Sequence, residues 1–121
     1  MSHIVTVRTH VRDVTALAAA CRRLGLEPPA RGVAELFNAK AEGQIVRLPG
    51  WQFPVVFDLE GAAHYDHFGG RWGDPKQFDK LLQAYAVEKA KQELRRQGHQ
   101  CTEQPLIDGS IKLLVRPGGA V

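Results

Sequence analysis

Hydrophobic and polar residues alternate at the start of the chain. Val5, Val7 and Val11 fall on one side of an extended backbone, and Arg8 and His10 fall on the other. A period of two is typical of a strand with one buried face. The pattern therefore predicts a half-buried strand near the N-terminus.

The period then lengthens to that of a helix. Asp13 is a suitable N-cap and Gly25 a suitable C-terminal stop. The apolar residues between them recur at helical spacing: Val14, Leu17, Ala18, Cys21 and Leu24. We expect an amphipathic helix that buries the thiol of Cys21 and keeps it inert.

The middle of the chain is rich in turns. The prolines of "LEPPARG" interrupt regular structure. The segments "VAELF", "QIVRL" and "WQFPVVFDL" are predicted to be short strands, separated by turns at "NAKAEG" and Pro49-Gly50. Because Pro54 cannot donate to a ladder, the start of the third segment is expected at an edge or a bulge.

A long second helix is the clearest element. Asp74 is a suitable N-cap, Pro75 occupies the first helical position and Gly98 follows the end. Its apolar stripe comprises Phe78, Leu81, Leu82, Tyr85, Ala86, Ala90 and Leu94. Beyond it, "CTEQPL" and "SIKLLVR" flank Asp108-Gly109, a dipeptide that favours a hairpin.

These elements predict one α+β domain. The order is strand, helix, three strands, helix, two strands, which indicates an antiparallel sheet of about five to six strands with two helices. We expect the domain to cover residues 1–116 and residues 117–121 to form a flexible tail. The exposed edges of an open sheet would also allow a homodimer.

Composition is that of a soluble globular chain. The 121 residues are 44% hydrophobic and 24% charged, with 16 basic and 13 acidic residues interleaved. No membrane span or signal peptide is recognisable, so we expect a cytoplasmic protein without membrane association. Cys21 and Cys101 are expected to be reduced thiols.

Candidate chemistry is concentrated in "HYDHFGGRWGDPKQF", residues 64–78. His64, Asp66 and His67 could supply two imidazoles and a carboxylate to a metal, but in an extended segment His67 would face away from the other two. The alternative function that these residues suggest is that of a metal-binding protein or a metal-dependent enzyme. No nucleophile with a neighbouring base is evident, and no cofactor is predicted.

The glycine-rich part of this segment has a structural interpretation. Gly69 and Gly70 would permit a turn with positive φ, Gly73 would allow close packing and Asp74 would cap the helix. Trp72 would then anchor the junction of sheet and helix. The same glycines leading into a helix resemble a phosphate-binding loop, yet no nucleotide-binding spacing is present.

Arg71 is not explained by that interpretation. An arginine beside a tryptophan on a loop is a composition typical of protein interfaces, and Arg71 could alternatively pair within the fold with Asp58 or Asp66. We therefore predict partner-binding residues Tyr65, Asp66, Arg71 and Trp72, with the structural loop and cap formed by Gly69, Gly70, Gly73 and Asp74.

Three segments carry a resemblance to a known family. "MSHIVTVRT", "GGRWGDPKQFDKLLQAYAVEKAKQELRRQG" and "TEQPLIDGSIKLLVR" resemble the bacterial branch of a family of small uncharacterised proteins, first noted as a hypothetical reading frame of algal plastids and cyanobacteria. Its pattern matches Tyr65, Asp66 and residues 70–74, but not His64 or His67. The resemblance implies an accessory role beside an ATPase of the AAA class.

Together these observations predict a non-enzymatic binding or adaptor module acting through residues 64–74. A third alternative is weak nucleic-acid binding through basic helix faces. Nucleic acid is the less favoured partner, because the arginine pairs Arg22-Arg23 and Arg95-Arg96 each close a helix, where the helix dipole accounts for them.

Overall fold

The computed structural model describes residues 5–37, 39–66 and 70–118. Within them the elements follow in the order β1 (Val5–Arg8), α1 (Val14–Arg23), β2 (Ala30–Glu35), β3 (Lys40–Val46), β4 (Val55–Phe57), β5 (Ala62–Tyr65), α2 (Pro75–Arg96), β6 (Gln100–Pro105) and β7 (Ile111–Arg116). The predicted α+β class is confirmed. The two helices, the meander of strands and the C-terminal hairpin all occur in the predicted order.

Five strands form one antiparallel sheet in the order β1-β5-β4-β3-β2. β5 lies between β1 and β4, so that Ala63 pairs with Val7 on one side and with Phe57 on the other. The sequence pattern did not predict β5. It is short, and its pairing with the N-terminal strand is a contact between distant parts of the chain.

The strand predicted at "WQFPVVFDL" is shorter than expected and is separated from β5 by a turn. The strand expected from Trp51 begins only at Val55, directly after Pro54, which lacks a ladder donor. After Phe57 the chain reverses: Asp58 Oδ1 accepts the amide N–H groups of Glu60 and Ala62, each at 2.9 Å.

Both helices begin at the predicted caps. Asp13 Oδ1 accepts the Ala16 N–H at 3.0 Å, and Asp74 Oδ1 accepts the Lys76 N–H at 3.0 Å. Pro75 occupies the first turn of α2, where its missing N–H costs no hydrogen bond. α2 extends over 22 residues and supports both the sheet and the hairpin.

The core lies between the helices and one face of the sheet. It unites alternate residues of the strands with the buried sides of α1 and α2, and its largest fully buried members are Phe57, Leu17, Leu81, Val46, Val55 and Cys21. Cys21 and Cys101 are free thiols, and burial raises the pKa of Cys21. Cys21 therefore behaves as a small apolar residue.

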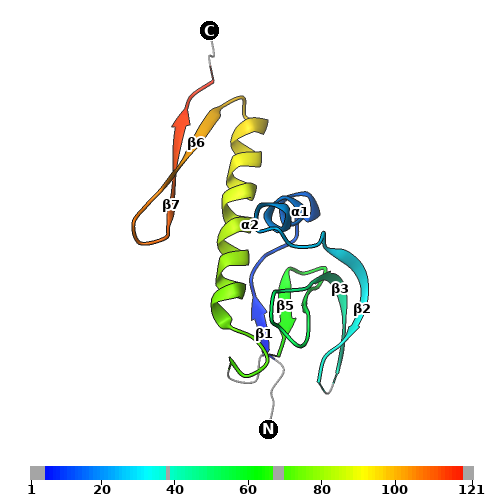
Figure 1. The fold of residues 1–121 in the computed structure, drawn as a ribbon. Helices are drawn as coiled ribbons and strands as arrows, with labels where there is room; N and C mark the ends of the chain where they lie inside the picture. The colour runs from blue at the N-terminus through cyan, green and yellow to red at the C-terminus, as the bar shows by residue number, and fades with distance from the viewer. Residues whose placement is uncertain (1–4, 38, 67–69, 119–121) are drawn as a thin grey trace.

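The hairpin β6–β7 is a separate two-stranded sheet, not a continuation of the larger one. It lies along α2 on the side away from the five-stranded sheet (Figure 1). Its turn contains Gly109 at φ +90°, and the Gln83 side chain donates to the Gly109 carbonyl at 2.8 Å. Asp108-Gly109 thus forms the predicted turn.

No helix in the described ranges has both the length and the apolar character required to cross a bilayer.

Candidate functional site

The segment that joins β5 to α2 is buried at its start and exposed at its end. Tyr65 and Asp66 are buried, whereas Gly70 and Arg71 are exposed. Of the predicted partner-binding residues, Arg71 and the half-buried Trp72 therefore lie at the surface, and Tyr65 and Asp66 lie inside. His67 and Gly69 lie outside the described residues.

His64 pairs with an aspartate of the preceding turn. Its Nε2 lies 2.7 Å from Asp58 Oδ2, and this hydrogen bond holds the pKa of the Asp58 carboxyl below its usual range, against the opposing effect of burial. Because Asp58 Oδ1 also binds the backbone of the turn, the pair ties β5 to the turn that precedes it. In the described ranges no three His, Cys, Asp or Glu side chains are grouped so that they could hold a metal.

Tyr65 belongs to an aromatic cluster in the core. Its ring centroid lies 4.7 Å from that of Phe78 and 5.8 Å from that of Trp51. Burial raises the pKa of the Tyr65 hydroxyl, and the nearby Asp79 carboxylate adds to the effect. The phenol is consequently a weaker proton donor than an exposed tyrosine.

Trp51 takes the anchoring position that the sequence had suggested for Trp72. Its indole packs beside the core against Phe78 and Tyr65, and its Nε1–H donates to the Asp74 carbonyl at 3.1 Å. A Cβ atom at Gly73 would come within 2.4 Å of this ring. Gly73 is thus required for close packing, as predicted, and its neighbour is Trp51.

Trp72 joins an aromatic patch at the surface. We use this name for Phe37, Phe53 and Trp72, which come from the segment after β2, the segment before β4 and the segment before α2. The Trp72 ring centroid lies 5.2 Å from that of Phe37 and 5.3 Å from that of Phe53. Phe37 is 49% exposed, and Arg71 is exposed beside Trp72.

Sequence reasoning missed Phe37 and Phe53 as members of this site. Each lies in a different segment, and neither has a local motif that marks it. Both phenylalanines were placed inside predicted strands, Phe37 at the end of "VAELF" and Phe53 in "WQFPVVFDL", whereas the structure ends β2 at Glu35 and begins β4 at Val55.

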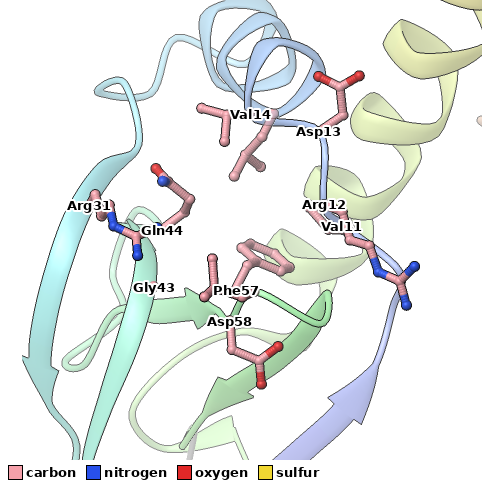
Figure 2. Close-up of a pocket in the computed structure, with 11 residues that line it drawn as sticks. Val11, Arg12, Asp13, Val14, Arg31, Gly43, Gln44, Phe57 and Asp58 are labelled. Atoms are coloured by element: carbon pink, nitrogen blue, oxygen red, sulfur yellow. The ribbon is translucent and has the colours of Figure 1, made fainter.

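A small cavity opens between α1 and the sheet (Figure 2). Val11, Leu17 and Phe57 line it, together with the polar residues Arg31 and Gln44. Figure 2 shows the Asp13 carboxylate and the Arg12 guanidinium pointing away from it. Its volume is about 60 Å³. Pockets that bind small molecules are usually larger, about 300–1,000 Å³.

A larger groove of about 530 Å³ runs between α2 and the segment before α1. Two of its polar side chains, those of Tyr85 and Lys89, hold the two helices together. The Tyr85 hydroxyl accepts the Asp13 N–H at 3.1 Å, and Lys89 Nζ lies 2.8 Å from Asp13 Oδ2. The Lys89 ammonium, helped by the Ala16 amide, lowers the pKa of Asp13 to about 2. Tyr85 and Lys89 thus bind the N-cap residue of α1 and hold it against α2.

The basic residues between the helices and the hairpin belong to an ion-pair cluster. Arg23 of α1 pairs with Glu103 of β6 and, at 3.1 Å, with Glu88 of α2, while Lys91 Nζ lies 2.7 Å from Glu103. Arg23 and Lys91 lower the pKa of Glu103 to about 2. These cations are neutralised within the fold, so they contribute little to a surface for phosphates.

Comparisons of the chain with known protein families, with curated proteins and with solved structures found no match.

Proposed function

We propose that this protein is a non-enzymatic adaptor that binds a protein partner through the aromatic patch and Arg71. The observation that carries the proposal is the position of Trp72 between Phe37 and Phe53, with Phe37 half exposed. Clustered aromatic side chains next to an arginine are the composition of interface hot spots.

The geometry of the patch supports this function. The backbone at Trp72 is held in place by the segment before β4, because the Gln52 N–H donates to the Trp72 carbonyl at 2.7 Å. The segment then enters α2 through the Asp74 cap. A tryptophan held in this way loses little conformational freedom on binding, which favours affinity.

The described side chains also give catalysis little support. The His64–Asp58 pair holds a turn, Tyr65 is in the core and the cavity in Figure 2 is smaller than a usual substrate pocket. In the larger groove, Tyr85 and Lys89 bind the N-cap of α1. We accordingly place the activity in recognition and not in chemistry. The family resemblance suggests an ATPase of the AAA class as the partner. The location that we propose is the cytoplasm, as expected from a sequence without a recognisable span or signal peptide.

A capture experiment tests the proposal. Tagged protein is used to recover partners from a lysate of its native host, alongside the variants Phe37→Ser and Trp72→Ala and the matched control Leu59→Ala. Leu59 is 75% exposed and lies in the turn before β5, away from the patch residues in sequence. We expect a partner that binds the unaltered protein and the control but is lost from both patch variants.

The recovered partner is then purified and titrated against each variant by calorimetry, with circular dichroism as the check on folding. Truncating a hot-spot aromatic residue should weaken binding by about 2 kcal/mol or more. If folded Phe37→Ser and Trp72→Ala proteins bind as tightly as the control, the patch is not the interface.

A further inference from the structure

The hairpin β6–β7 is a two-stranded ribbon that packs on α2 and has apolar side chains at its surface. In the described part of the chain each of its strands has the other as its ladder partner. Leu114 and Val115 of β7 are 45% and 46% exposed. A two-stranded sheet is marginal in water unless it packs against a helix or gains further strands. α2 covers one face of this ribbon, and within the described residues its outer strand edges remain open to a further strand.

The two edges of the ribbon differ in character. β6 reads Gln-Cys-Thr-Glu-Gln-Pro, and its Pro105 has no N–H to offer a further strand. β7 reads Ile-Lys-Leu-Leu-Val-Arg, with a backbone N–H at every position. The outer edge of β6 is thus protected against pairing with another strand, whereas the outer edge of β7 is able to pair with one.

The faces of the ribbon are also distinct. Glu103 and its partner Leu113 lie on the face turned to the helices, since Glu103 pairs with Arg23 of α1 and Lys91 of α2. Ile111 and Val115 share this face by alternation, and Lys112 and Leu114 lie on the other. A further strand that pairs with β7 extends the apolar face only if its own apolar residues lie on the face turned to the helices.

We propose that β7 pairs antiparallel with β7 of a second copy of this chain, forming a four-stranded sheet around a two-fold axis at Leu113. In this register Ile111 of one copy lies opposite Val115 of the other, and Lys112 lies opposite Leu114. The apolar residues that face the helices become continuous across the axis, as an isologous interface requires.

Charge excludes the neighbouring symmetric registers. An axis at Lys112 would place the two Lys112 side chains opposite each other, and an axis at Leu114 would place Lys112 opposite Arg116. Like charges directly opposite each other in a sheet are destabilising. A shift to an axis between two residues would join opposite faces and break the apolar surface. The axis at Leu113 avoids all three conflicts.

The consequence for binding is bivalency. The hairpin follows the C-terminal end of α2, whereas Trp72 lies just before its N-terminal end (Figure 1). The dimer would leave both aromatic patches accessible, so a ring-shaped or repetitive partner would be bound with avidity.

Two variants that place a positive or a negative charge at position 114 test this register. Sedimentation velocity over a concentration series measures the dimer dissociation constant of the unaltered protein, of Leu114→Lys and of Leu114→Glu. We expect Leu114→Lys, which creates two Lys–Lys pairs across the axis, to weaken the dimer by about 2- to 30-fold. Leu114→Glu, which creates two Glu–Lys pairs, should tighten it by a comparable factor.

Ile107→Lys is the matched control, because Ile107 is a fully exposed aliphatic residue at the hairpin turn and lies outside the proposed pairing. It should leave the dissociation constant unchanged. A protein that stays monomeric at the highest concentration overturns the proposal. So does a dimer that the two Leu114 variants shift in the same direction or not at all, or one that Ile107→Lys disrupts.

Discussion

At the level of single residues, the contact between Gly73 and Trp51 decides how the chain enters α2. The indole is held on both sides, by its hydrogen bond to the Asp74 carbonyl and by its packing against Phe78. Three ring atoms would lie 2.4–2.6 Å from a Cβ at position 73. The glycine is therefore required by the aromatic neighbour, and not only by the turn.

Gly73→Ala should lower the free energy of unfolding by about 1–3 kcal/mol, because the ring cannot move without losing its other contacts. Urea denaturation followed by tryptophan fluorescence measures the loss. In a Trp51→Leu background the same substitution should cost less, since the smaller side chain leaves room for a methyl group. Equal costs in both backgrounds would show that the indole is not the obstacle.

At the level of elements, the ion-pair cluster fastens the hairpin to the helices. Glu103 of β6 forms ion pairs with Arg23 of α1 and Lys91 of α2, and all three side chains are less than one-third exposed. α1, whose Arg23 lies 80 positions before Glu103, thus meets α2 and β6 at one carboxylate. Stability of the hairpin on α2 should depend on the charge of Glu103.

This dependence predicts a loss of stability in acid. The folded-state pKa of Glu103 is about 2, below its ordinary value of 4.5. The stabilisation is complete above the unfolded pKa and is lost as the pH falls from about 4.5 to about 2.

Glu103→Gln isolates this effect from Asp13, whose pKa is also about 2. The difference in unfolding free energy between the unaltered protein and Glu103→Gln should be largest at neutral pH and should shrink through that acid range. Urea denaturation at several pH values measures it. A difference that does not change with pH would assign the loss to packing and not to charge.

At the level of the whole molecule, one core joins the sheet to both helices and carries most of the stability. A domain of this size is stable by only about 5–15 kcal/mol. Leu81, on the second turn of α2, is completely buried in the core beside residues of the sheet. The surface sites proposed above depend on this core but do not contribute to it.

Leu81→Ala should lower the free energy of unfolding by about 2–5 kcal/mol, since it removes buried methyl groups and leaves a cavity. Leu59→Ala changes the same residue type at a position that is 75% exposed and should stay within about 0.5 kcal/mol of the unaltered protein. Thermal or urea unfolding of the two variants makes the comparison. Equal losses would place the core elsewhere.

The elements that were predicted correctly depend on short-range signals. Asp13 and Asp74 cap helices by binding amides two or three residues away. Asp108-Gly109 forms its turn within a few residues. β5 was missed because its place between β1 and β4 depends on β1, which lies more than fifty positions earlier.

The candidate site was predicted only in part for the same reason. Gly73 packs closely, as expected, while the sequence left open whether Arg71 is exposed, and the structure places it at the surface. The roles of the two tryptophans were not separable, since Trp51 and Trp72 each lie beside a glycine and an aromatic residue would suit either position. Which indole reaches the core depends on how the segment before β4 and the segment before α2 pack against each other.

The sequence by itself determined the α+β class, the helix caps and the hairpin turn, because backbone hydrogen bonds and periodic burial act within a few residues. Only the tertiary structure decided that the hairpin stands apart on α2, that Tyr65 and Asp66 are buried, and that Phe37, Phe53 and Trp72 meet. Those outcomes depend on which distant surfaces exclude water together, a property of the assembled layers that no local pattern contains.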